Sequence, residues 1–213
     1  MEDLTGKPAI IKTHKEEHLG TGLARAGQIL LDGGLVAFPT ETFYGLAVNA
    51  LNEEAVGRLF ALKKRGNDRP ILILIPSLEY LERYVEQVPE IASMLIKRFW
   101  PGGLTLLFRA GPSIPGLLTA GTGKIGIRLS SHPVATGLAK AVDSPITGTS
   151  ANISGQPPCT NAGEVRDSLK GGVDLILDGG ETKGGKGSTV LDITVNPPRI
   201  FREGEISADN LGL

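Results

Sequence analysis

The sequence predicts an α/β fold, in which strands and helices alternate along a chain of 213 residues. Short apolar runs, such as residues 35–38 and 71–75, have the composition of buried strands. Amphipathic segments of helical length, such as residues 53–64, separate them. No repeat or low-complexity linker divides the chain, so we expect a single domain over residues 1–213.

The first half of the chain is expected to contribute three strands and two helices. A strand at residues 7–13 leads into a helix at residues 14–31, which ends at two consecutive glycines. The strand at residues 35–38 is stopped by a proline, and the helix at residues 53–64 gathers its apolar side chains on one face. Residues 71–75 are apolar at every position, so this strand should be buried on both faces.

The second half continues the alternation. A helix at residues 89–99 stops at a Trp-Pro-Gly-Gly sequence, and a helix at residues 133–142 begins with proline, which suits the first turn of a helix. An apolar start at residues 145–149 leads into a polar loop. The remaining strands are expected at residues 104–108, 125–129, 173–177, 188–193 and 199–201.

The composition is that of an ordinary globular protein, with 40% hydrophobic and 21% charged residues. A net charge of −1 argues against a protein that binds nucleic acid through its overall charge, although it does not exclude a local basic patch. The single cysteine, Cys159, excludes an internal disulfide framework and suggests a reducing compartment. The sequence has no apolar run of about 18 residues and no signal-peptide core, so we expect a cytoplasmic protein without a membrane segment.

The loop after the strand at residues 35–38 is the first candidate site. Thr40, Glu41 and Thr42 come just after the strand, and Tyr44 follows two residues later. In an open α/β sheet, ligands bind where buried strands end, so these hydroxyl groups are suited to hold a small polar ligand. An ordinary capped turn has the same composition, and both interpretations stay open on these residues alone.

Cations and further polar groups form the second set of candidates. Lys63 and Arg65 close the predicted helix, where they either stabilise the helix dipole or clamp phosphate oxygens. Arg128 lies in an otherwise apolar strand, where a guanidinium needs an anion or a buried partner, and a bound carboxylate would supply an anion. Hydroxyl, amide and guanidinium groups also lie at or near strand ends at Ser150, Asn152, Ser188, Thr189 and Arg202. Together these groups favour positioning and charge stabilisation of phosphates over hydrolysis by a catalytic triad.

Three motif matches fail on their context. Residues 180–186 resemble a phosphate-binding P-loop, but Gly187 stands where the motif needs serine or threonine, and a strand follows instead of a helix. Residues 121–126 match the dinucleotide fingerprint but precede a strand. His14 and His18 have the H-x-x-E-H spacing of a zinc peptidase helix, yet the segment is polar. A solvated helix start is the better interpretation, and we predict no metal site built by the protein itself.

Six motifs occur in order along the chain: Pro39-Thr40-Glu41-Thr42-Phe43-Tyr44-Gly45-Leu46, Lys63-x-Arg65, Trp100-Pro101-Gly102-Gly103-Leu104-Thr105, Ile127-Arg128, Thr149-Ser150-Ala151-Asn152 and Gly187-Ser188-Thr189-Val190. In these motifs the chain resembles the YrdC-type threonylcarbamoyl-AMP synthases over residues 10–205. The resemblance implies a twisted, open, mixed sheet of the YrdC/RibB kind, with flanking helices and a concave cleft. It also implies the short, single-domain form of the family.

The resemblance further implies a reaction and its partners. L-threonine, bicarbonate or CO2, and ATP would form L-threonylcarbamoyladenylate and pyrophosphate, with Mg²⁺ bridging the phosphates. Partner proteins would then transfer the threonylcarbamoyl group to tRNA, where it becomes part of threonylcarbamoyladenosine. In this reaction the threonine amine captures CO2 as a carbamate, whose oxygen attacks the α-phosphorus, so that no covalent enzyme intermediate is needed.

Carried onto this sequence, the family motifs imply a catalytic pair, a set of residues for ATP and a set for L-threonine. The catalytic pair would be Lys63 and Arg65. ATP would be bound by Lys63, Arg65, Ser150, Asn152 and Arg202. The first four would hold its phosphates, and Arg202 would contact the nucleotide from the C-terminal side. L-threonine would be held by Thr40, Arg128 and Ser188, with Arg128 pairing its carboxylate. Glu41 and Tyr44 receive no role.

Two other functions stay open beside this one. A related domain of hydrogenase maturation forms carbamoyl-adenylate from carbamoyl phosphate, but it normally lies within a much longer multidomain chain. A module that binds double-stranded RNA or tRNA would use the concave face, and its affinity would fall steeply with salt. The net charge of −1 argues against RNA binding as the main role.

Overall fold

The structure, a computed structural model, describes residues 8–14 and 16–212. Short β-branched and aliphatic segments form its strands, in agreement with the apolar runs of the sequence. The strands are β1 (Ala9–Lys12), β2 (Val36–Pro39), β3 (Tyr44–Ala47), β4 (Leu72–Leu74), β5 (Leu104–Arg109), β6 (Lys124–Arg128), β7 (Ile146–Ser150), β8 (Leu175–Asp178), β9 (Thr189–Asp192) and β10 (Arg199–Arg202).

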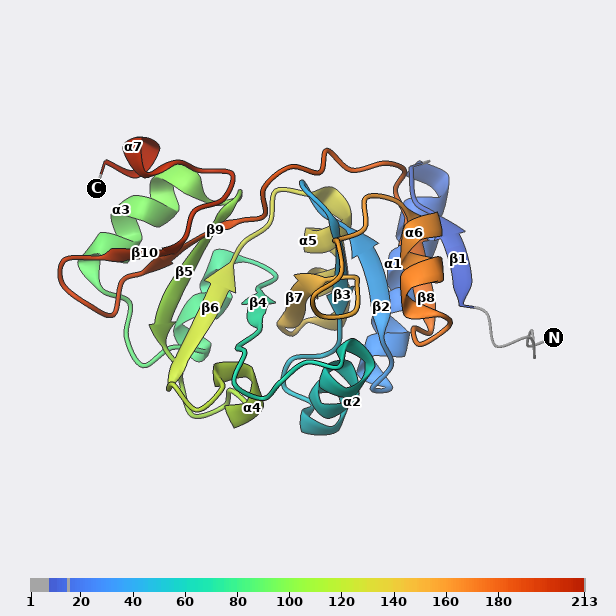
Figure 1. The fold of residues 1–213 in the computed structure, drawn as a ribbon, viewed down its shortest axis with the longest axis horizontal. Coiled ribbons are helices and arrows are strands. Elements are labelled where there is room, and N and C mark those ends of the chain that lie inside the picture. The colour runs from blue at the N-terminus through green and yellow to red at the C-terminus, as the bar shows by residue number, and fades with distance from the viewer. Residues whose placement is uncertain (1–7, 15, 213) are drawn as a thin grey trace.

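These strands form one mixed sheet in the order β1-β8-β2-β3-β7-β4-β6-β5-β9-β10. β8 runs parallel to both β1 and β2, whereas β3 is antiparallel to β2 and to β7. The sheet is open, with β1 and β10 at its two ends (Figure 1). The predicted α/β fold with a mixed open sheet is therefore confirmed.

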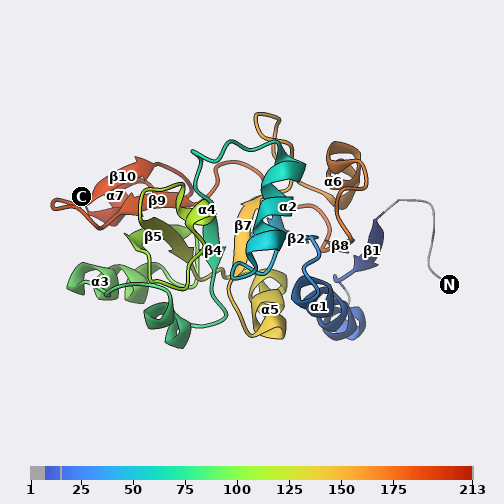
Figure 2. The same ribbon diagram turned by 90° about the horizontal axis from the view of Figure 1, so that it is seen from below.

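Helices cover both faces of this sheet. They are α1 (Glu16–Leu31), α2 (Glu53–Lys63), the short 3₁₀ helix η1 (Leu78–Arg83), α3 (Glu90–Phe99), α4 (Gly116–Thr119), α5 (Pro133–Val142), α6 (Ala162–Leu169) and α7 (Ala208–Leu211). Figure 2 shows α1 and α5 on one face and α2 and α6 on the other. One apolar core lies between the sheet and the α1–α5 pair, and a larger one continues from α2 and α6 to α3. No helix in residues 8–14 and 16–212 is both long and apolar enough to span a membrane.

Several elements differ from the sequence-based expectation. The sequence predicts no strand over Tyr44–Ala47, but this stretch forms β3 and pairs with β2 as a hairpin. It is only four residues long and contains a glycine, so its apolar pattern is too short to predict a strand. α6 was also missed, because its sequence AGEVRDSL is mainly polar on its exposed side. The expected first strand began at Lys7 and the expected first helix included Lys15, and both residues lie outside the described ones.

The topology brings distant parts of the sequence together near the middle of the sheet. The β2–β3 turn, the end of β7 and the end of β6 come from parts of the chain that are far apart in sequence, yet β3, β7, β4 and β6 are consecutive in the sheet. The segment after β8 must cross from one end region of the sheet to the other to reach β9 (Figure 1). A cavity lies where these segments meet.

Candidate functional site

A cavity of about 410 Å³ opens at this meeting point, large enough for a nucleotide-sized ligand. Its wall combines apolar residues of the sheet, among them Phe38 and Leu74, with hydroxyl, amide and guanidinium groups. Seven of the eight residues that the sequence assigned to ligands line it: Thr40, Arg65, Arg128, Ser150, Asn152, Ser188 and Arg202. The structure therefore brings nearly the whole predicted set into one space, while their individual roles stay predictions.

Three residues that the motifs assign to the ATP phosphates, Arg65, Ser150 and Asn152, lie on the side of the cavity formed by the ends of α2 and β7. Lys64 ends α2 in the left-handed conformation, with φ of 50°, and this turn directs Arg65 toward the cavity. The Arg65 guanidinium donates from Nε to the carbonyl of Arg69 (3.0 Å) and from Nη2 to that of Pro70 (2.8 Å). Its Nη1 group donates to none of the described residues and remains available to an anion.

Lys63 is the predicted site residue that does not line the cavity. Its side chain is only 1% exposed, and its ammonium donates to the carbonyl oxygens of Ser150 (2.5 Å) and Asn152 (2.7 Å). Burial, reinforced by the neighbouring Arg65 charge, lowers the pKa of Lys63 from 10.5 to about 8. Lys63 thus holds the loop that carries Ser150 and Asn152, and its contact with phosphate stays a prediction.

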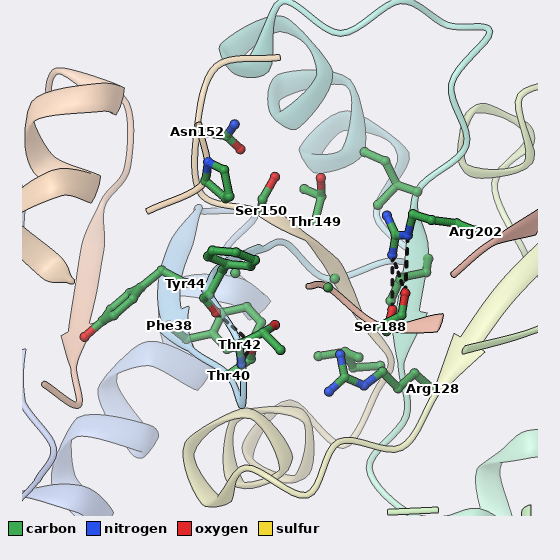
Figure 3. A pocket seen from close by; sticks show the side chains of 18 of the residues that line it. Phe38, Thr40, Thr42, Tyr44, Arg128, Thr149, Ser150, Asn152, Ser188 and Arg202 are labelled. Atoms are coloured by element: carbon green, nitrogen blue, oxygen red, sulfur yellow. Dashed lines mark hydrogen bonds between the residues drawn. The ribbon is translucent and has the colours of Figure 1, made fainter. Parts of the chain in front are cut away.

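The residues that the motifs assign to L-threonine come from other parts of the cavity wall. Thr40 donates its hydroxyl to the carbonyl of Phe43 (2.7 Å), which closes the β2–β3 turn. Ser188 exchanges a hydrogen bond with Thr105 of β5 (2.9 Å) and contacts Arg202 through its carbonyl oxygen (2.9 Å). Figure 3 shows Thr40 and Arg128 at one end of the cavity, with Ser150 and Asn152 at the opposite end.

Arg128 has the anionic partner that its buried position requires, and that partner is Glu41. Nη2 of Arg128 lies 2.5 Å from Oε2 of Glu41, and Nε donates to the carbonyl of Gly102 (2.8 Å). The two charged side chains are 7% and 13% exposed, respectively. The sequence indicated that Arg128 needs an anion or a buried partner, and in the structure the carboxylate of Glu41 fills this role. Pairing of Arg128 with a bound carboxylate stays a prediction.

The electrostatic character of the cavity follows from its lining. Three guanidinium groups, those of Arg65, Arg128 and Arg202, reach its wall, whereas no Asp or Glu of the described residues lines it. Such a wall attracts anionic ligands and is poorly suited to hold a bare cation. Among residues 8–14 and 16–212, no three His, Cys, Asp or Glu side chains cluster closely enough to bind a metal ion.

Comparisons with known proteins agree with this site. The Sua5/YciO/YrdC family model, which is described by the words "Telomere recombination", matches residues 28–204. The chain belongs to the Sua5/YciO/YrdC family. Within it, the chain is 44% identical over 186 residues to the threonylcarbamoyl-AMP synthase of Pyrococcus abyssi, covering 87% of this chain and 55% of that protein. It is 36% identical over 195 residues to a putative threonylcarbamoyl-AMP synthase of Mycobacterium tuberculosis, covering 92% and 89%.

Solved structures of this family have the same fold. P. abyssi Sua5 complexed with L-threonine matches with a TM-score of 0.90 and 41% identity, over 95% of this chain and 59% of that chain. Escherichia coli YciO matches with a TM-score of 0.84 and 27% identity, over 93% and 96%. The chain spans about half the length of the P. abyssi and Bacillus subtilis relatives, 55% of each. The YrdC-like fold that the motifs implied is thereby confirmed.

Two residues of this family member received no role from the sequence, and the structure gives both extensive contacts. Tyr44 is fully buried, donates its hydroxyl to the carbonyl of Gly180 (2.8 Å) and accepts from the amide of Gly179 (3.1 Å). Burial, together with the nearby Asp178, raises the pKa of Tyr44 to about 12. Tyr44 therefore fixes the start of the segment that crosses from β8 to β9.

Glu41 is the second of these residues. Its Oε1 accepts hydrogen bonds from the hydroxyls of Ser130 and Ser131 (both 2.8 Å), and from the amides of Ser131 (2.5 Å) and His132 (3.1 Å). Burial alone would raise the pKa of Glu41, but the Arg128 charge and these hydrogen bonds outweigh it and lower the pKa from 4.5 to about 2. The only signal in the sequence was a carboxylate between two threonines at a strand end.

The lowered pKa predicts a pH dependence of stability. Because Glu41 has a folded-state pKa below the unfolded value, its contribution to the free energy of unfolding is present above about pH 4.5 and is lost as the pH falls toward 2. We expect the difference in unfolding free energy between wild type and Glu41→Gln to shrink by about 2 kcal/mol between about pH 7 and about pH 3. Urea titrations at both pH values measure it, and a constant difference would contradict the assignment.

Gly204 supports the Ser188 side of the cavity through close backbone packing. A methyl group at this position would overlap the backbone of Gly187, Ser188 and Thr189. We therefore expect Gly204→Ala to lower the free energy of unfolding by about 2 kcal/mol and to weaken ligand binding, because Ser188 must move. The matched control is Gly57→Ala in α2, where an added methyl group has no neighbour within 4 Å and should be neutral or slightly stabilising. Equal behaviour of the two variants in urea titrations would contradict the prediction.

Proposed function

We propose that this chain is an L-threonylcarbamoyladenylate synthase, which joins L-threonine, bicarbonate or CO2, and ATP into threonylcarbamoyl-AMP and pyrophosphate. The observation that carries the proposal is the pairing of two anion-binding ends in one cavity. Ser150 and Asn152 lie at one end, where Lys63 joins them to the end of α2 that carries Arg65. Arg128 lies with Thr40 at the other end. A reaction that joins a triphosphate to an amino acid needs a binding site for each substrate in one cavity, close enough for the reacting atoms to meet.

The family relatives support the same assignment. The P. abyssi relative bears the name threonylcarbamoyl-AMP synthase, and P. abyssi Sua5 has been solved in complex with L-threonine. The M. tuberculosis relative, named a putative synthase, is matched over 89% of its length. We extend the activity to this chain because the residues that the motifs assign to ATP and threonine meet in one cavity here, apart from Lys63, which lies directly behind it.

The geometry supports different roles for the residues around the cavity. Arg65, Ser150 and Asn152 would hold the phosphates of ATP, and Arg202 would contact the nucleotide from the side of β10. Arg128 would pair the carboxylate of threonine through the donors that face the cavity. The threonine amine captures CO2 as a carbamate and releases a proton to solvent. A carbamate oxygen then forms a bond to the α-phosphorus, and the bond from this phosphorus to pyrophosphate breaks. The guanidinium groups stabilise the negative charge that develops on the phosphates.

Magnesium enters this proposal as part of the nucleotide substrate. The cavity wall offers hydroxyl groups but no carboxylate from the described residues, which does not fit a resident magnesium site. A magnesium ion bound to the ATP phosphates needs no dedicated protein ligand, so we write the substrate as MgATP.

Threonylcarbamoyl-AMP is a mixed anhydride, so its natural acceptor is a nucleophile on another molecule. We assign this acceptor to tRNA, reached through transfer proteins.

The proposal is tested by following pyrophosphate release from ATP. Release should require L-threonine and bicarbonate together, and should stop when either is omitted. Release that does not depend on threonine would overturn the proposal. Release supported by carbamoyl phosphate instead would favour the carbamoyl-adenylate alternative. Salt-sensitive binding of double-stranded RNA without any pyrophosphate release would favour an RNA-binding module.

A further inference from the structure

Glu41 ties together two segments that are far apart in the sequence and in the sheet. It lies in the turn between β2 and β3, beside Thr40, and its carboxylate reaches residues 130–132 at the start of α5. The same carboxylate pairs with Arg128 at the end of β6. In the sheet, β7 and β4 lie between β3 and β6, so this contact links two segments that follow non-adjacent strands. Thr40 and Arg128, which both belong to the proposed threonine site, are thereby held at a fixed separation.

The carboxylate approaches Arg128 from outside the ligand cavity. Arg128 lines the main cavity, whereas Glu41 does not, and instead lines a neighbouring cavity of about 330 Å³ together with Thr42 and Lys183. Two of the three guanidinium nitrogens have protein partners, since Nε donates to Gly102 and Nη2 to Glu41. Nη1 has no acceptor within residues 8–14 and 16–212. In Figure 3 the guanidinium of Arg128 points across the cavity toward Thr40.

The other hydrogen bonds to the Glu41 carboxylate come from residues that do not line the main cavity. Its Oε1 accepts four hydrogen bonds from Ser130, Ser131 and His132, at the N-terminal end of α5. Only Oε2 engages Arg128. Glu41 therefore does not occupy the place of a ligand carboxylate; it fixes the plane of the guanidinium and leaves one edge of it open.

We propose that Glu41 is a positioning residue that sets Arg128 for recognition of the substrate carboxylate. This inference rests on the proposed function, in which that carboxylate belongs to L-threonine. With Gly102 on one nitrogen and Glu41 on another, the planar guanidinium has one orientation, and its free nitrogen presents donors at a fixed place. Selectivity for an amino acid over its neutral amide then depends on Glu41, although Glu41 touches neither.

The experiment compares two substrates and two ion-pair variants. Glu41→Gln keeps an acceptor oxygen for Ser130 and Ser131 but turns an amide donor toward Arg128, so it disturbs the guanidinium while sparing the turn. Asp192→Asn is the matched control, because Asp192 forms an ion pair of 2.8 Å with Lys124 and neither residue lines the cavity. Steady-state pyrophosphate release is measured with L-threonine and with L-threoninamide, which lacks the carboxylate charge.

We expect Glu41→Gln to raise KM for threonine about tenfold, while KM for ATP and the low activity with threoninamide change less than about twofold. The preference for threonine over its amide should fall by the same factor, and Asp192→Asn should keep the wild-type preference. If Glu41→Gln fails to fold, Glu41→Asp serves instead, because it keeps the charge but is one methylene too short to reach both partners.

Two results would overturn the inference while leaving the proposed function intact. One is an unchanged threonine preference in folded Glu41→Gln. The other is a parallel rise of KM for threonine, threoninamide and ATP, which would mean a general loosening of the cavity. Wild-type protein that releases no pyrophosphate with threonine would instead overturn the proposed function, and the inference with it.

Discussion

Replacing Lys63 with methionine is expected to lower kcat/KM for pyrophosphate release by about a thousandfold. Methionine keeps the apolar stem of the side chain but removes the ammonium. The carbonyl oxygens of Ser150 and Asn152 then lose their buried donor, and the loop that presents these residues to the cavity shifts. A displacement of about 1 Å in a positioning loop is enough to cost two orders of magnitude in rate, and the lost charge near the phosphates adds to this.

The same variant should lose stability as well, because Lys63 is buried. Leaving a buried carbonyl unpaired costs about 1–3 kcal/mol, so we expect the free energy of unfolding to fall by about 2 kcal/mol. Lys64→Met is the matched control, since Lys64 is the next residue and its side chain is exposed. Steady-state kinetics and urea titrations measure both effects. Activity within about twofold of wild type in folded Lys63→Met would contradict the prediction. It would mean that Lys63 only stabilises the end of the helix and has no role in the site.

Arg128→Met is the second variant for which we expect a large effect. It removes the cation from a buried ion pair and leaves the Glu41 carboxylate without its charged partner. Breaking such a pair on one side costs about 3–5 kcal/mol, and KM for threonine should rise at least about a hundredfold because the substrate carboxylate also loses its partner. Thermal or urea unfolding and threonine-dependent pyrophosphate release measure the two losses separately.

The double variant Arg128→Met with Glu41→Gln separates the structural from the functional part of this effect. Neutralising both partners removes the unpaired charge, so part of the lost stability should return. Threonine recognition should not return, because no cation faces the substrate. Recovery of threonine turnover in the double variant would show that Arg128 serves only the fold. Failure to recover any stability would show that Glu41 and Arg128 are not coupled.

The alternation of strands and helices could be predicted because inner strands such as β2, β4 and β8 are apolar at nearly every position. Ile73 is fully buried, and a short apolar run of this kind, bounded here by Pro70 and Pro76, is typical of a strand covered on both faces. The hairpin strand Tyr44–Ala47 could not be predicted, because it is formed by pairing with β2 and β7 and not by its own pattern. Tertiary pairing overrides local sequence in such a short segment.

The candidate site shows the same limit. The need of Arg128 for an anion could be predicted from a charge in an apolar strand, but its partner Glu41 is 87 residues away in the sequence, and only the folded sheet brings them together. Lys63 was expected to face solvent or phosphate, as cations at helix ends usually do. Its burial depends on the loop after β7, which packs over the end of α2 and supplies the carbonyl acceptors.

The central claim is that one cavity joins threonine, a one-carbon unit and ATP. Mass spectrometry of the nucleotide product tests it most directly, with the protein incubated with ATP, L-threonine and isotopically labelled bicarbonate. We predict an adenylate that contains both the threonine moiety and the labelled carbon, formed in step with pyrophosphate. An adenylate that lacks threonine, or ATP consumption that yields only AMP or ADP without any such intermediate, would contradict the claim.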